Sequence, residues 1–279
     1  MVSGRVMRRF GLGDPVGAPV RVPGGLSNEL WRVTTAEGVF AVKRMVVNAD
    51  RPDFVGNVEA SFGVEWRAWR SGVPMPEPLS EGGRALVAVD GSLYRAHRWV
   101  ESREGAASVR DAAGLLARIH AAGEPRWAPA VDGGWDGRRW GAEVAGLARR
   151  VAEQPARVLV VDSHRDLDRK NTLLGVDGVL MAVDWDAAGP VSAVQEVVAV
   201  ALDWSGGDPG AFAEGVGAYG RVVPAEPWVF GGWVAAQGGW LDYVAEHQPG
   251  EAERTLAELR GLAAGLDVLL SVLPSPPGR

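Results

Sequence analysis

The most constraining feature of this sequence is a polar loop, HRDLDRKN, that lies between two apolar runs. The runs at residues 158–161 and 179–183 predict two strands, and the second run ends directly on Asp184. The loop supplies Asp166 and, five residues later, Asn171. Phosphoryl transfer needs a carboxylate that orients a hydroxyl and hard oxygen ligands that hold Mg²⁺ against the phosphates. The pattern therefore predicts a phosphoryl-transfer site, and the alternative is a polar turn with no catalytic role.

The H-R-D-L-x-x-x-N spacing of this loop is the one found in protein kinases. The element that begins at Asp184 reads Asp-Trp-Asp rather than Asp-Phe-Gly, and no Ala-Pro-Glu follows it. The chain continues directly into Gly-Pro and an apolar segment, which leaves no room for a long activation segment. We therefore expect a small-molecule acceptor rather than a protein substrate.

Composition excludes several other classes of protein. The chain has 279 residues, 47% of them hydrophobic, which is enough for one large domain or two lobes. A net charge of −6 argues against a nucleic-acid-binding surface. The N-terminus lacks an apolar run of signal-peptide length, and no run approaches the ~18 apolar residues of a membrane span. We expect a cytoplasmic protein that binds neither nucleic acid nor membrane, as a monomer or homodimer.

Lys43 is one of two lysines among 29 basic residues, and it ends the segment FAVK. That segment matches the V-A-I-K strand motif, whose lysine reaches the α- and β-phosphates of a nucleotide. Strands are predicted at residues 18–23, 30–35 and 39–44, with the loop GGLSN after the first. Backbone N–H groups of this loop are candidates for phosphate binding, at Gly25, Ser27 and Asn28. The alternatives are an ordinary hairpin loop and a solvated edge lysine.

The apolar spacing of residues 53–71 predicts a helix with Glu65 beside its apolar stripe. A carboxylate directed toward the core needs a buried cation, and we expect Lys43 to be its partner. Glu59 is the second candidate partner for Lys43, and the alternative is that Glu65 is a solvated residue at the rim of the helix. A hairpin over residues 84–100 completes a five-stranded sheet with one helix, and Val100 lies where a nucleotide base would stack.

Helical spacing dominates after residue 108, and acidic charge dominates after Asp184. The residues beyond Asp184 include 12 acidic and 4 basic side chains, a net charge of −8, whereas residues 1–184 carry +2. This surplus would attract a cationic acceptor, for which Asp186, Asp203 and Trp204 are candidate contacts. The alternative is that the acids face solvent and the tryptophans belong to the core.

Taken together, these motifs resemble those of the aminoglycoside phosphotransferase and choline kinase-like family. The resemblance spans most of the chain and rests on GGLSNELWRV, FAVKR, GVPMPEP, SHRDLDRKN and VDWDAAGP. It implies an α+β, bilobal, protein-kinase-like fold. Residues 1–101 would form a nucleotide-binding lobe with an antiparallel sheet and one helix. Residues 102–279 would form a larger, mainly helical lobe with the catalytic loop and the acceptor site.

The resemblance also implies transfer of the γ-phosphate of MgATP or MgGTP to a hydroxyl of a small molecule. A cationic antibiotic such as an aminoglycoside is the expected acceptor, which would make the protein a resistance enzyme. A kinase for choline, a sugar or an amino-acid derivative, or a catalytically idle nucleotide-binding protein, is the alternative. The implied roles are phosphate contact for Lys43 supported by Glu65, catalytic base for Asp166 in a loop structured by His164, and Mg²⁺ binding for Asn171 and Asp184.

Overall fold

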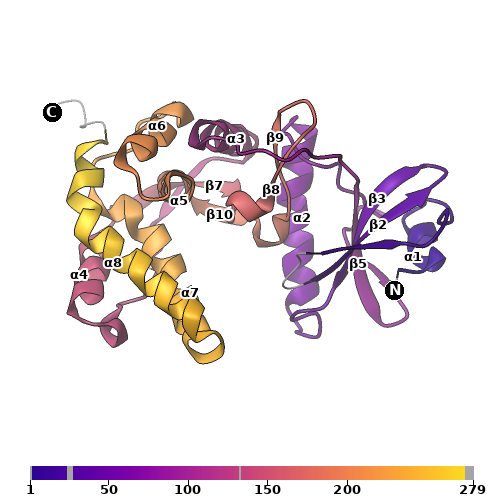
Figure 1. Cartoon of the computed structure of the whole chain (residues 1–279), viewed down its shortest axis with the longest axis horizontal. Helices are drawn as coiled ribbons and strands as arrows, with labels where there is room; N and C mark the ends of the chain where they lie inside the picture. The colour runs from indigo at the N-terminus through magenta and orange to yellow at the C-terminus, as the bar shows by residue number, and fades with distance from the viewer. Residues whose placement is uncertain (1, 24–27, 132, 274–279) are drawn as a thin grey trace. The chain divides into compact units, whose positions relative to one another are not determined.

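The structure is a computed structural model that describes residues 2–23, 28–131 and 133–273 (Figure 1). The chain forms two compact units, one of residues 1–106 with 170–189 and one of residues 107–169 with 190–279. The division expected from the sequence lay at residue 101, whereas the first unit extends to residue 106 and also includes residues 170–189. Backbone bonds explain this: Arg103 N donates to Leu174 O at 2.9 Å, and Ala182 N donates to Pro74 O at 3.0 Å.

The first unit contains a five-stranded antiparallel sheet, as the sequence predicts. In spatial order its strands are β1 (Val20–Val22), β2 (Asn28–Thr35), β3 (Gly38–Met45), β5 (Ser92–Arg98) and β4 (Val87–Val89). The predicted helix is α2 (Phe54–Arg70), and a short helix, α1 (Gly4–Arg9), precedes the sheet. The expected fold class, an antiparallel sheet lobe followed by a mainly helical part, is confirmed.

The two faces of this sheet have different characters, because side chains alternate along a strand. One face packs on α1 and is apolar, with Phe40, Val42 and Ala96 in its core. The other face is directed toward α2, and Figure 1 shows α1 and α2 on opposite sides of the strands. Lys43 and Arg95 belong to this second face and stand opposite each other in the β3–β5 register. The sheet thus places two cations side by side next to α2.

A second, smaller element of this unit carries the polar residues that follow the loop. Strands β8 (Thr172–Leu174) and β9 (Leu180–Ala182) form an antiparallel hairpin. Just beyond its paired residues, Val183 N donates to Asn171 O at 2.9 Å, so the two backbones remain side by side there. The chain then turns through a left-handed residue, Asp184 at φ +62°, into the short 3-10 helix η3 (Trp185–Ala187).

The second unit is mainly helical. Its helices are α3 (Val109–Ala122), α4 (Ala142–Ala152), α5 (Ala193–Ser205), α6 (Pro209–Tyr219), α7 (Gly231–His247) and α8 (Pro249–Ser271). Short 3-10 turns are η1 (Arg138–Trp140), η2 (Arg169–Asn171), which crosses into the first unit, and η4 (Pro227–Phe230). None of the helices in the described ranges combines the length and the apolar composition needed to cross a bilayer.

A three-stranded sheet beside these helices was only partly predicted. Its order is β10 (Gly189–Ser192), β7 (Arg157–Ser163) and β6 (Arg126–Pro129), and only β7 was expected. The strand β6 was not predicted, and its four residues, RWAP, show no alternation of apolar and polar side chains. The strand β10 includes Pro190 and leads directly into α5, so its four residues were read as the approach to a helix.

Candidate active site

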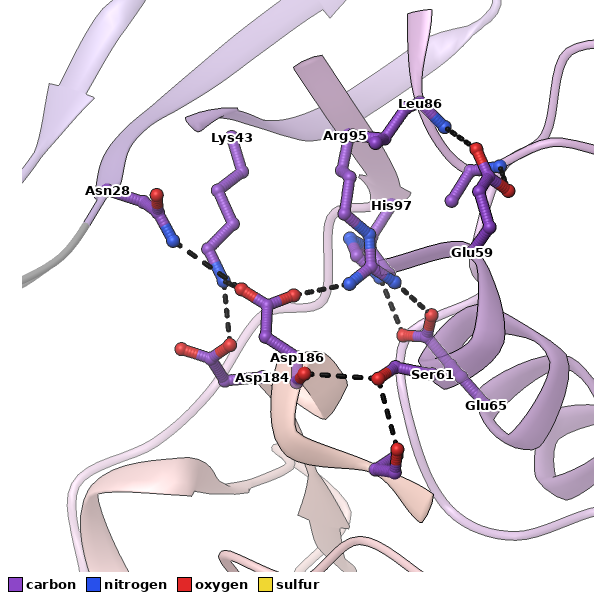
Figure 2. A network of polar contacts seen from close by, with 12 residues as sticks. Asn28, Lys43, Glu59, Ser61, Glu65, Leu86, Arg95, His97, Asp184 and Asp186 are labelled. Carbon is purple, nitrogen blue, oxygen red and sulfur yellow. Dashed lines mark hydrogen bonds and ion pairs between the residues drawn. The ribbon is translucent and has the colours of Figure 1, made fainter. Parts of the chain in front are cut away.

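Lys43 lies between two carboxylates that follow β9 (Figure 2). Its Nζ atom is 2.6 Å from Asp184 Oδ1 and 2.6 Å from Asp186 Oδ2. The side chain of Lys43 is 15% exposed, whereas those of Asp184 and Asp186 are 46% and 26% exposed. The strand lysine therefore lies beside Asp184, and Asp184 has the largest exposed fraction of the three side chains.

The backbone of the second carboxylate is fixed to α2. Ser61 Oγ lies 3.1 Å from the carbonyl oxygen of Asp186 and 3.0 Å from that of Ala188. Ser61 is buried, and the single proton of its hydroxyl is shared between these two carbonyls. The η3 turn is thereby held with the Asp186 side chain directed at Lys43, as Figure 2 shows.

Glu65 is buried on α2 as predicted, but its partner is not Lys43. Its Oε2 atom binds Arg95 Nη2, and its Oε1 atom is 2.8 Å from His97 Nε2. Arg95 reaches Asp186 with its other terminal nitrogen. The expected Lys43–Glu65 pair is therefore replaced by a Glu65–Arg95 pair, because Arg95 comes from the adjacent strand on the same face and is itself buried. Sequence reasoning missed Arg95.

Electrostatic coupling keeps this cluster ionised despite burial. Burial alone would raise the pKa of Asp186, but the charges of Lys43 and Arg95 lower it well below the ordinary value. Burial opposes the charged form of Lys43, and the two aspartates outweigh that effect and raise its pKa. For Glu65, burial raises the pKa, but the charges of Arg95 and then His97 outweigh that effect, so the pKa lies below its ordinary value. The carboxylates are therefore acceptors, and Lys43 remains an ammonium.

The donor set near Asp184 fits a magnesium ion that is completed by phosphates. Asn171 is buried, and its backbone is hydrogen-bonded to the residue that precedes Asp184. No group of three or more His, Cys, Asp and Glu side chains suited to a metal occurs among the described residues. Mg²⁺ commonly uses one or two carboxylates together with phosphate oxygens and water rather than a full protein cage. Asn171 and Asp184 would supply such a partial set.

Other predicted nucleotide contacts are only partly described. Gly25 and Ser27 lie outside the described residues. Asn28 begins β2, where its Oδ1 atom accepts a hydrogen bond from Val46 N at 3.0 Å, and its Nδ2 atom is 3.4 Å from Asp186 Oδ2. Val100 is half-buried directly after β5. Asn28 therefore borders the carboxylate cluster.

The second candidate partner for Lys43 is engaged elsewhere. Glu59 lies on α2, and its carboxylate accepts hydrogen bonds from the backbone N–H groups of Ala85 and Leu86 at 3.0 and 3.2 Å. These bonds tie the segment before β4 to the helix. Glu59 therefore has a structural role.

In the helical unit, the loop after β7 is held by a buried acid from α5. Arg165 takes a left-handed conformation, φ +67°, and its N–H donates to Glu196 Oε1 at 2.7 Å. Glu196 Oε2 is 2.7 Å from His120 Nε2, and His120 Nδ1 is 2.7 Å from the Tyr219 hydroxyl. His164 is fully buried beside them in sequence. This chain of contacts fixes the backbone immediately before the predicted base.

Asp166 itself is exposed at the surface of the helical unit. Its N–H is 3.3 Å from His164 Nδ1, which is consistent with the predicted role of that histidine in ordering the loop. Leu167 is buried, and its carbonyl oxygen accepts a hydrogen bond from Trp204 Nε1 at 3.0 Å. The Trp204 ring is buried, and the Arg169 guanidinium lies 4.4 Å from its centroid, which favours the alternative that this tryptophan belongs to the core.

Two acids of the helical unit, Asp242 and Asp203, accept hydrogen bonds from tryptophan side chains. Asp242 accepts Nε1–H from Trp135 and Trp140 at 2.9 and 2.8 Å, which uses both of its oxygens. Asp203 Oδ1 accepts from Trp233 at 2.8 Å, so one oxygen of this exposed acid is occupied. Although its surface is exposed, the protein atoms around Asp203 displace part of its hydration and raise its pKa to about 6. The indole bond opposes this shift, and the charge of Asp168 adds to it. Of these two acids, Asp203 is the one with a carboxylate oxygen outside its indole hydrogen bond.

A cavity inside the helical unit does not fit a charged ligand. It lies between residues 131–135, α4, Gln195 and the start of α7. Its described lining consists of glycine, alanine, valine, one tryptophan and two glutamines, without an ionisable side chain. A cationic acceptor would find no counter-charge there.

Comparison with known proteins identifies the family. Residues 20–231 match the model of the phosphotransferase enzyme family (APH). The match spans most of the chain and includes Lys43, Asp184 and Asp186. The chain belongs to this family. The resemblance inferred from the motifs is therefore confirmed. A search of curated protein sequences found no match to this phosphotransferase.

Solved structures support the same fold. A spectinomycin phosphotransferase in complex with ADP and spectinomycin superposes with a TM-score of 0.63 at 11% identity, covering 98% of this chain and 99% of that one. A microcompartment-associated aminopropanol kinase has a TM-score of 0.59 at 18% identity, covering 91% and 92%. A macrolide 2′-phosphotransferase from Brachybacterium faecium has a TM-score of 0.57 at 16% identity, covering 99% of both chains. At these identities the likeness establishes the fold of this phosphotransferase and leaves its acceptor open.

Proposed function

We propose that this phosphotransferase moves the γ-phosphate of MgATP, or of MgGTP, to a hydroxyl of a small molecule. The observation that carries the proposal is the approach of the Lys43 ammonium to Asp184 Oδ1 at 2.6 Å, in a chain of the phosphotransferase family. A strand lysine facing the aspartate after β9 is the arrangement in which one group contacts phosphates and the other holds their metal. The ADP bound in the spectinomycin phosphotransferase structure adds support for the nucleotide.

Each residue has a defined task in the proposed reaction. Asp166 accepts a hydrogen bond from the acceptor hydroxyl and takes its proton as the new P–O bond forms. Lys43 stabilises the negative charge on the phosphate oxygens, and Asn171 and Asp184 would hold Mg²⁺. When bound, the metal would neutralise phosphate charge. Because little covalent chemistry is required of the protein, positioning and charge account for the catalysis.

We further propose that the acceptor is cationic, with an aminoglycoside or another antibiotic as the leading class. The support is the net charge of −8 after Asp184 together with Asp203, an exposed acid that has one oxygen bound to Trp233. Spectinomycin and macrolide phosphotransferases occur among the similar structures. The aminopropanol kinase favours a second candidate, a kinase for a small amino alcohol of primary metabolism.

The test is a screen of antibiotics, amino alcohols and sugars with MgATP, read out by thermal shift and by acceptor-dependent ADP formation. We expect one class to raise ADP formation clearly above the rate without acceptor. The variant D166N should lose at least 10³-fold in acceptor-dependent turnover while its ADP affinity stays within about twofold. Retained turnover in a clean D166N preparation would exclude Asp166 as the base. Nucleotide binding with no transfer to any acceptor would favour the idle nucleotide-binding alternative.

A further inference from the structure

Arg95 is a second buried cation beside the phosphate-site lysine. It stands opposite Lys43 on the neighbouring strand, its side chain is 3% exposed, and its two terminal nitrogens bind Glu65 and Asp186. A guanidinium does not lose its proton in a protein, so a buried arginine has to be paired with acids. Arg95 therefore occupies the α2 carboxylate that the strand lysine was expected to bind.

The carboxylate of Asp186 is shared between the two cations. Figure 2 shows it between the ends of Lys43 and Arg95, with one oxygen toward each. If Lys43 left this carboxylate, Arg95 would still compensate its charge. If Arg95 were removed, Lys43 would be the remaining cation in the contacts described for this side chain.

Phosphate binding draws on the hydrogen-bond donors that now serve the aspartates. An ammonium has three N–H donors, and Lys43 directs two of them at Asp184 and Asp186. A nucleotide phosphate would therefore compete with these carboxylates for Lys43. This competition is weaker when Arg95 also binds Asp186, because the carboxylate then keeps a cationic partner after Lys43 turns to the phosphate.

We propose that Arg95 is a positioning residue for nucleotide binding, because it retains the Asp186 carboxylate and so releases Lys43 to the phosphates. This inference rests on the proposed function, since it requires Lys43 to bind phosphate. Arginine suits the task because its planar fork holds one acid with each terminal nitrogen, which a lysine point charge does with less directionality. Ser61 contributes by fixing the backbone of the same aspartate.

The experiment measures ADP affinity by calorimetry, once with Mg²⁺ and once with EDTA in its place. We expect R95M to weaken ADP binding at least tenfold in EDTA, because Asp186 then holds Lys43. In EDTA the double variant R95M/D186N should recover most of that loss, because the competing carboxylate is gone. A purely structural role for Arg95 would not produce such recovery. Comparing the ADP affinities with Mg²⁺ and with EDTA shows how much of the effect of D186N comes from metal binding.

Two controls keep the result readable. R98M changes an arginine of the same strand whose side chain is 49% exposed and bound to Glu77, and its ADP affinity should stay within about twofold of the wild type. R95M also leaves Glu65 with a weaker partner, which threatens folding. The same series is therefore repeated in an E65Q background, where Glu65 no longer carries a charge that needs Arg95, and each variant is checked by thermal unfolding.

The outcomes distinguish the two proposals. Equal ADP affinity in wild type and R95M would overturn the role of Arg95 and leave the proposed function intact. An R95M/D186N variant as weak as R95M would show that Arg95 only supports the fold, which also overturns the inference. A wild-type protein that binds no ADP would overturn the proposed function and this inference with it.

Discussion

Replacing Glu196 should cost the helical unit more stability than replacing any exposed acid. Glu196 is 5% exposed, and its two oxygens accept from Arg165 N and contact His120 Nε2, both at 2.7 Å. E196A removes both acceptors and leaves an N–H of a left-handed residue without its partner. Breaking a buried charged contact of this kind costs about 3–5 kcal/mol, whereas E196Q keeps the shape and should cost about 1–2 kcal/mol.

The assay is urea unfolding followed by tryptophan fluorescence, together with acceptor-dependent turnover. The matched control is E214Q, because Glu214 forms an exposed pair with Arg110 whose loss should cost less than about 1 kcal/mol. Turnover should fall with E196A more than ADP affinity does, because the loop it supports carries the predicted base. If E196A and E214Q unfold at the same urea concentration, the structural importance assigned to this acid is wrong.

The pH dependence of the same pair provides a second check. Burial would raise the pKa of Glu196, but the hydrogen bond and charge of His120 lower it below the ordinary 4.5. A group with a depressed folded pKa contributes stability that is present above the unfolded value and is lost as the pH falls through the folded value. The difference in unfolding free energy between wild type and E196Q should therefore be constant above pH 4.5 and shrink below it.

Three further substitutions test other contacts. W204F removes the hydrogen bond to the Leu167 carbonyl, so it should cost about 1–2 kcal/mol in urea unfolding and lower kcat more than ADP affinity; an unchanged kcat would contradict this. D203N removes a carboxylate whose pKa is raised to about 6, so its stability relative to the wild type should increase as the pH rises from 4 to 6, by less than about 1 kcal/mol; a pH-independent difference would argue against the raised pKa. S61A removes the hydroxyl shared between two backbone carbonyls, so thermal unfolding should show a loss of about 1–2 kcal/mol, and an unchanged stability would contradict the role assigned to Ser61.

Local signals in the sequence were sufficient for much of the first unit. The alternation of strands and the helical spacing around Glu65 predicted the five-stranded sheet and α2, because each follows from a short window. The V-A-I-K match singled out Lys43, and the end of the second apolar run singled out Asp184, and the structure places these two side chains in contact. These features depend on residues that chain order and strand alternation bring together.

The partners of buried charges could not be predicted in the same way. Arg95 takes the place expected for Lys43 beside Glu65, and only the β3–β5 register reveals that the two cations stand on the same face of the sheet. A signal existed, because β5 reads SLYRAHR and places two basic residues two apart on one face. Glu196 had a similar signal, because it is followed in α5 by six apolar residues. The pairing of Arg95 with Glu65, and that of Glu196 with His120, depends on tertiary contacts rather than on spacing.

Because the sequence has only two lysines, chemical modification of Lys43 can report whether the carboxylate cluster around it is formed. Acylating reagents need an unprotonated amine, and the two aspartates keep the Lys43 amine protonated and mostly covered, whereas Lys170 is exposed. Mild acetylation followed by peptide mass spectrometry would thus modify Lys170 readily and leave Lys43 almost untouched. The ratio of the two modified peptides would then measure, variant by variant, how much of the population has this ion cluster assembled.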